Sequence, residues 1–163
     1  MPHDGQDIGP ADAILPDLLA LTSAAIAPVE RVFEAARESV RARVSVEGRV
    51  SGARIEAEQT AAHGLAWLAT YLESLRQMQG WAERLDAQGA FGEVERLIHQ
   101  IAFGEYLWQV YGGIQMNQGE IVRLQDMGLS QDDMRALMTP EVMRLTQEAN
   151  SQAARARLVD LMQ

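Results

Sequence analysis

Apolar residues recur at steps of three and four positions through most of this 163-residue chain, and alternation of apolar with polar residues is nearly absent. That spacing is typical of amphipathic helices, whose apolar stripe faces a core. One such stripe consists of Ile26, Val29, Phe33, Ala36, Val40 and Val44. The sequence therefore predicts an all-α protein, an antiparallel bundle of about four main helices followed by short C-terminal helices.

Prolines and glycines predict where the N-terminal helices begin and end. Pro28 lies within the helical pattern of residues 11–44 and indicates either two helices or one kinked helix. Two glycines in the stretch 45–52 predict a break, and the alternation of valines there is too short to predict a strand. Ser51 is then the expected N-cap of a long helix that runs to about Ala87.

The C-terminal half predicts shorter helices. A helix over residues 91–110 contains Gly104, which costs about 1 kcal/mol relative to Ala and indicates a close approach by another helix. A weaker helix is predicted over Asn117–Met127, ended by a glycine. Three further short helices are predicted from their N-caps, which are Ser130, Thr139 and Ser151.

Length and composition limit the function classes. The expected organisation is a disordered lead-in at residues 1–10, a bundle over 11–129, and short helices over 130–163 that pack on the bundle or on a partner domain. The absence of cysteine excludes disulfides, thiolate metal sites and a cysteine nucleophile. A net charge of −9 argues against nucleic acid as a partner, and the absence of lysine excludes Schiff-base chemistry.

The N-terminal residues do not predict a signal peptide, because no positive stretch precedes an apolar one. No apolar run approaches the ~18–20 residues that a membrane span needs. These features lead us to expect a cytoplasmic protein that has no membrane partner.

The histidines and carboxylates do not predict a metal centre. A di-iron bundle needs Glu-x-x-His pairs, but Thr60 precedes His63 and Arg96 precedes His99 at that spacing. Glu95 and His99 share a helix face, which is a common surface arrangement. His63 lies beside the apolar stripe, where we expect it at the edge of the core and hydrogen-bonded to a neighbour.

Two groups of residues have more than one interpretation. The region Arg37–Arg54 holds five arginines, which either bind the phosphate of a CoA ligand or complement the dipole at a helix C-terminus. The tryptophans and tyrosines at helical spacing either fill the core or, where exposed, mark a partner surface. The many methionines of the C-terminal third also suit an adaptable docking surface.

The most distinctive stretch begins Gln-Val-Tyr-Gly-Gly at residue 109 and follows an amphipathic helix. The two glycines suit a helix cap and tight turn, or a close backbone approach. Together with Arg123 and Asp126 further on, the motif resembles the C-terminal helical domain of flavin-dependent acyl-CoA dehydrogenases. In that family the Gln-x-x-Gly-Gly segment lies near FAD across a subunit interface. The resemblance therefore implies three cofactor-binding candidates, which are Gln109, Gly112 and Gly113.

A more specific similarity is to a helical N-terminal extension that one member of this superfamily carries ahead of its dehydrogenase body. Residues 61–85 and 103–129 carry this similarity, which covers roughly Val40 to the end of the chain. That member works in the bacterial ethylmalonyl-CoA pathway of acetate assimilation. The resemblance implies a parent enzyme that uses FAD, and no cofactor held by this chain alone.

The sequence lacks two features on which catalysis in the superfamily depends, a barrel domain and a catalytic Glu. No strand-rich segment of barrel length occurs, so the walls that hold flavin and CoA in the family are missing. The family's catalytic Glu has no counterpart in residues 128–137, which read GLSQDDMRAL. Glu73 is the nearest analogue on an earlier helix, and it has no predicted substrate pocket beside it. No catalytic residue is therefore predicted.

These observations predict a non-catalytic helical accessory domain of a flavin-dependent acyl-CoA dehydrogenase, used for docking or oligomerisation. Its expected partners are the dehydrogenase body or like subunits, a homodimer among them. The alternative is a free-standing helical adaptor or scaffold protein. A bundle enzyme with a site in its core is a third option.

Overall fold

Three long helices make up most of the protein. The computed structural model describes residues 13–163, and the lead-in predicted over residues 1–10 lies outside them. The long helices are α1 (Leu18–Val44), α3 (Gln59–Ala87) and α4 (Glu93–Gly112). The shorter elements are β1 (Ser45–Val46), β2 (Arg49–Val50), α2 (Gly52–Ala57), β3 (Ile114–Gln115), β4 (Ile121–Val122), the 3₁₀ turn η2 (Leu124–Met127), α5 (Gln131–Leu137), α6 (Pro140–Arg144), the π-helical turn η3 (Leu145–Ala149) and α7 (Gln152–Leu161).

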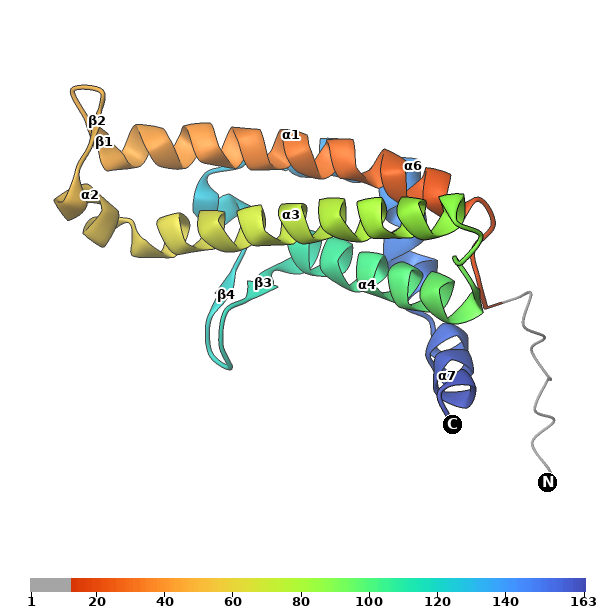
Figure 1. Cartoon of the computed structure of the whole chain (residues 1–163). Coiled ribbons are helices and arrows are strands. Elements are labelled where there is room, and N and C mark those ends of the chain that lie inside the picture. Colours follow the sequence, from red (N-terminus) through yellow and green to blue (C-terminus); the bar gives the residue numbers. More distant parts are fainter. Residues whose placement is uncertain (1–12) are drawn as a thin grey trace.

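The helices form a layered bundle. Helices α1 and α3 run antiparallel and side by side along the molecule, and α4 packs against α3 (Figure 1). The short elements α5, α6 and η3 lie behind α1 and α3 in this view, where α5 and α6 contact α1 and η3 contacts α4. The prediction of an all-α bundle is confirmed, and a series of short helices occupies the place of a fourth long helix.

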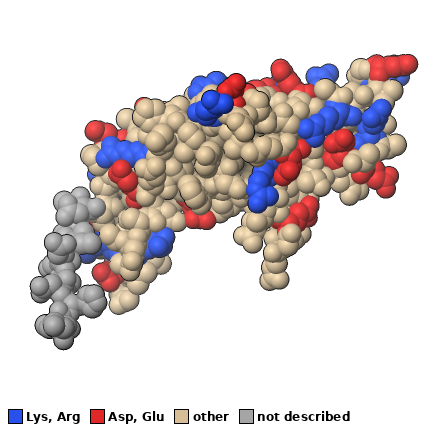
Figure 2. Space-filling model, turned by 180° about the vertical axis from the view of Figure 1, so that it is seen from behind, with Lys and Arg blue, Asp and Glu red and all other residues tan. Residues whose placement is uncertain are grey.

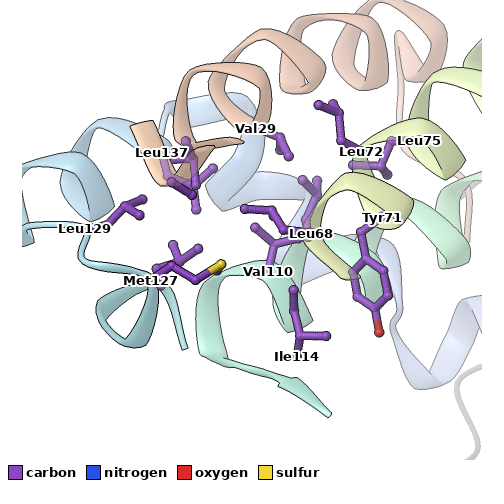
Figure 3. Packing of buried hydrophobic residues seen from close by; sticks show 14 of the residues in the cluster. Val29, Leu68, Tyr71, Leu72, Leu75, Val110, Ile114, Met127, Leu129 and Leu137 are labelled. Atoms are coloured by element: carbon purple, nitrogen blue, oxygen red, sulfur yellow. The ribbon is translucent and has the colours of Figure 1, made fainter. Parts of the chain in front are cut away.

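The main hydrophobic core lies where these layers meet. Figure 3 shows Val29 of α1, Leu68 and Leu72 of α3 and Val110 of α4 directed toward the same interior. From the C-terminal side, Leu137 of α5 joins the same cluster. Each large aliphatic side chain buried in this way contributes roughly 1.5–3 kcal/mol of transfer free energy. The core thus links residues that lie more than 100 positions apart in the sequence.

The N-terminal half decides between the alternatives for Pro28 and differs from the prediction at Ser51. A single helix, α1, passes through Pro28, which is buried. Ser51 does precede a helix, but that helix is the short α2, and Ser51 makes no side-chain capping bond. The chain leaves helical geometry at Glu58 (φ −111°, ψ 30°) before α3 begins. The prediction of one helix from Ser51 to Ala87 is therefore wrong at its start, while its end before the left-handed Gly89 is confirmed.

The helix predicted over Asn117–Met127 is wrong for most of its length. Residues 114–122 form the hairpin β3–β4, in which Ile114 pairs with Val122, and only the turn η2 is helical. The hairpin buries both Ile114 and Val122 in the main core, which a surface helix would not do. At its tip the Asn117 side chain accepts a hydrogen bond from the amide of Gly119 at 2.9 Å, a bond that favours a turn over a helix.

The C-terminal predictions are confirmed. Ser130, Thr139 and Ser151 each cap a helix, and each side chain accepts a hydrogen bond from a backbone amide of the first turn. Gly104 does mark a close approach, because η3 crosses α4 there. A Cβ atom at Gly104 would lie 3.0 Å from the Leu145 carbonyl oxygen and from the amide nitrogen of Asn150.

We expect Gly104→Ala to destabilise the protein by about 1–3 kcal/mol, because backbone atoms of η3 cannot move aside as a flexible side chain can. The gain in helix propensity, about 1 kcal/mol, offsets only part of this cost. Gly80→Ala is the matched control, since the nearest atom there is the flexible Arg84 guanidinium at 3.3 Å. Urea unfolding would measure both, and equal stabilisation by the two substitutions would contradict the close approach.

Candidate functional site

Both ends of the Gln109 amide make a hydrogen bond within the chain. The Tyr71 hydroxyl, from α3, donates to Gln109 Oε1 at 2.5 Å, and Gln109 Nε2 donates to Glu105 Oε1 at 2.7 Å. Burial of Tyr71, together with the neighbouring Tyr106 and Glu105, raises the pKa of the Tyr71 phenol, so it remains a donor at neutral pH. Gln109 therefore joins α3 to α4.

The two glycines that follow have different surroundings. Gly112 is the last residue of α4, and no atom lies within 4 Å of where its Cβ would be. Gly113 has φ +132°, and the Ile121 side chain of β4 lies 2.5 Å from the position of a Cβ atom. Gly113 is thus required for the turn from α4 into the β3–β4 hairpin.

These residues also serve the fold. Each end of the Gln109 amide makes a hydrogen bond inside the chain, and the hairpin residue Ile121 covers Gly113. The Asp126 carboxylate accepts a hydrogen bond from the backbone amide of Arg123 at 2.7 Å, and the Asp126 carbonyl accepts one from Arg43 at 2.9 Å. The Arg123 side chain itself is exposed. The cofactor-binding role that the resemblance implies for Gln109, Gly112 and Gly113 stays a prediction.

Glu73 lies on the surface of α3, away from any enclosed cavity. Its carboxylate accepts a hydrogen bond from Gln77 at 2.7 Å and lies 3.7 Å from the Arg76 guanidinium. The hollow beside it is shallow and lined by other residues of α3 only. The described residues therefore provide no enclosed pocket beside this carboxylate.

The arginines of the region Arg37–Arg54 lie on the C-terminal half of α1, on β2 and on α2, and these elements meet at one end of the molecule (Figure 1). Arg37 pairs with Glu34 one turn earlier, and Arg43 is held by Glu58 and by the Asp126 carbonyl. The phosphate-binding role suggested for this region stays a prediction.

One exposed aromatic side chain stands out on α4. Trp108 is 54% exposed, and its ring lies 6.3 Å from that of Tyr111. A hollow of about 330 Å³ separates Trp108 from η3, where Thr146 and Gln147 line it. We call the surface formed by Trp108, Tyr111, Thr146 and Gln147 the Trp108 face.

Most residues that line the hollow beside Trp108 are uncharged, with Glu105 as the one charged residue among them. Figure 2, the view from behind, shows uncharged surface between groups of charged side chains. An exposed tryptophan with mostly uncharged neighbours is typical of the centre of a protein–protein interface.

A buried polar cluster lies where sequence analysis expected a surface pair. His99 of α4 is fully buried, so its interpretation as a surface partner of Glu95 is wrong. The signal was present in the spacing, because His99 continues the stripe of buried residues Phe103, Leu107 and Val110. The cluster contains one polar residue of α1, one of α3 and two of α4, which are Thr22, Gln79, His99 and Gln100.

The hydrogen bonds of this cluster form a chain. His99 Nε2 lies 3.0 Å from the Thr22 hydroxyl, which donates to Gln79 Oε1 at 2.7 Å. Because that hydroxyl has one proton, His99 Nε2 is the donor to Thr22, and Nδ1 carries the lone pair. Nδ1 is buried without a hydrogen-bond partner among the described residues. Burial lowers the pKa of His99 to about 4, an effect that the carboxylate of Glu83 partly offsets.

His63, in contrast, is exposed. It is hydrogen-bonded to a neighbour as predicted, since its Nε2 accepts from the Trp67 indole at 3.1 Å, but it does not lie at the core edge. Within residues 13–163, no three His, Asp or Glu side chains come close enough to hold a metal ion. None of the helices in this part of the chain is both long and apolar enough to span a membrane.

The fold and these sites define an all-α bundle whose distinctive polar residues hold helices together. No family model matches the chain. It is 54% identical over 151 residues to (2S)-methylsuccinyl-CoA dehydrogenase of Cereibacter sphaeroides. The match covers 91% of this chain and 26% of that enzyme, so the chain spans about a quarter of its relative's length. The similarity to this member of the superfamily, predicted from residues 61–85 and 103–129, is confirmed.

We expect Tyr71→Phe to cost about 1 kcal/mol of stability, because Gln109 Oε1 loses its donor. In a double-mutant cycle with Gln109→Leu, the two changes should be less than additive by a similar amount. Tyr106→Phe is the control, since the Tyr106 hydroxyl has no hydrogen bond among residues 13–163. Thermal and urea unfolding measure the cycle, and strict additivity would show that the bond contributes nothing.

Proposed function

We propose that this chain is a non-catalytic helical part of an acyl-CoA dehydrogenase of the methylsuccinyl-CoA type, and that it serves docking or oligomerisation. The observation that carries the proposal is the 54% identity over 91% of the chain to a dehydrogenase of which the match covers only 26%. The described part of this chain folds as a helical bundle with two short hairpins, around a core of its own.

The internal roles of the candidate residues support a non-catalytic part. Gln109 and Gly113 are occupied by packing within the chain, and Glu73 is a surface carboxylate beside arginine. Chemistry on a thioester needs a positioned base and a cavity that excludes water. In this proposal those groups, and FAD, belong to the dehydrogenase body.

The Trp108 face is the surface we assign to contact with that body. An exposed tryptophan between two hollows can anchor a partner, and the second hollow, about 490 Å³ beside Tyr111, is lined partly by Met134 and Met138. The charged residues that line these two hollows, Glu105 and Arg135, have opposite signs and the other lining residues are uncharged, so a partner meets little of the chain's net charge of −9 there. In the proposal the parent acts in the ethylmalonyl-CoA pathway, in the bacterial cytoplasm.

Complementation tests this proposal. We would delete the matching residues from the Cereibacter sphaeroides enzyme, purify the remainder, and titrate it with this chain by calorimetry and light scattering. We expect a defined complex, and we expect Trp108→Ser to weaken binding at least tenfold, as loss of an interface anchor does. Val50→Ser is the matched control, because Val50 is 62% exposed but lies on the β1–β2 hairpin.

The other outcomes are distinct. A chain that stays monomeric and does not bind the truncated enzyme would favour the free-standing adaptor. A stable homodimer that excludes the truncated enzyme would assign the Trp108 face to self-association. Reduction of an electron acceptor by the purified chain with methylsuccinyl-CoA would overturn the non-catalytic assignment.

A further inference from the structure

The segment that leads into α1 is attached to the bundle mainly through two neighbouring residues of α4. We call residues 13–22 the N-terminal strap. Gln100 Oε1 accepts a hydrogen bond from the amide of Leu15 at 2.7 Å, and Gln100 Nε2 donates to the Ala13 carbonyl at 3.0 Å. His99, the residue before it, reaches Thr22 at the other end of the strap. Two consecutive buried polar residues thus anchor both ends of the strap.

The strap contributes no fully buried residue to the main core. Its residues Leu15 and Leu21 are partly buried and pack against the edge of that core, Ala13 belongs to a small cluster with Leu97 and Ala154, and Leu18 belongs to another with Ala82 and Phe91. Gln79 of α3 also holds the strap, through the Leu19 carbonyl and the Thr22 hydroxyl. Opening the strap therefore removes edge contacts, the two small clusters and these polar anchors, while the fully buried residues of the α1–α3–α4 core keep their contacts with one another.

The surroundings of His99 favour the neutral form of its imidazole ring. Its imidazole lies between Phe91, at 5.8 Å between ring centroids, and Phe103, at 4.7 Å. A proton on Nδ1 would have no acceptor, because that nitrogen is buried without a partner among the described residues. A charge placed there loses its hydration and gains no hydrogen bond.

Few other charged or polar groups lie near His99 at this end of the bundle. Thr22 of α1 is uncharged, and on α3 Gln79 passes a hydrogen bond to the exposed Glu83 at 2.9 Å. Asp17 and Asp86 line the adjoining hollow, which is about 700 Å³. On α4 itself, besides Glu95, the Arg96 guanidinium lies 5.5 Å from the centre of the Phe91 ring. Of these groups, only the Glu83 carboxylate raises the pKa of His99, and its effect is smaller than the lowering of the pKa by burial.

We propose that His99 makes the N-terminal strap an acid-operated latch, which holds residues 13–22 closed while the imidazole is neutral and releases them when it is protonated. Opening brings the ring into water and exposes the apolar surface of Phe91 and Leu97. The proposal is independent of the docking role assigned to the Trp108 face.

The direction of the pH effect follows from the two states of the ring. The pKa of His99 is about 4 in the closed strap and returns to about 6.5 in water. The open strap therefore binds the proton more tightly, so closure is fully stable above pH 6.5 and is weakened as the pH falls from 6.5 to 4. Between pH 7 and pH 5 the opening equilibrium should rise about 20-fold.

Hydrogen exchange read by mass spectrometry tests the latch on the whole chain. Protection factors, corrected for the intrinsic exchange rate at each pH, are compared for the strap and for residues 65–75 of α3. We expect protection of the strap to fall about 20-fold from pH 7 to pH 5 while that of α3 changes little. In His99→Gln, which keeps a donor but cannot titrate, this pH dependence should vanish.

Two further variants keep the test decisive. His63→Gln, at the exposed histidine, should retain the full pH dependence. Thr22→Val should open the strap at both pH values yet preserve the ratio between them, so it substitutes for His99→Gln if that variant does not fold. A joint loss of protection by strap and α3, or an undiminished ratio in His99→Gln, would overturn the latch.

Discussion

The packing of α1 along α3 is the constraint on which the rest of the structure depends. These helices have 27 and 29 residues, and each would be only marginally stable in water unless its apolar side were covered. Their facing stripes place Val29, Leu68 and Leu72 in one core. Helix α4 and the short C-terminal helices then cover what remains exposed, so every later element is positioned against this pair.

The polar residues inside the bundle set how the helices meet. Tyr71 and Gln109 join α3 to α4 near one end, and the cluster around His99 joins all three long helices near the other. Buried polar groups of this kind contribute little net stability, but they disfavour any packing that would leave them unpaired. Nδ1 of His99 and Oγ of Ser45 are buried without a partner among the described residues, and in the proposed latch His99 is the group that responds to protonation.

The motif that resembles an FAD-binding segment shows how sequence and role can separate. Its glutamine and second glycine remain, but in this chain they serve the α3–α4 contact and the turn into a hairpin. Identity to a dehydrogenase over most of the chain, together with these internal roles, agrees with a structural part of a larger enzyme. Function must therefore be argued from the contacts of the site rather than from the motif.

The sequence by itself determined the helical class, the ends of most helices and the close approach at Gly104, because periodicity, caps and glycine act through neighbouring residues. It did not determine the hairpin at residues 114–122 or the break at Glu58. The hairpin depends on burying Val122 against helices distant in sequence, so local propensity was overridden. Only the tertiary structure decided the partners of the buried His99, because Thr22 and Gln79 lie on two other helices and local spacing cannot place them beside it.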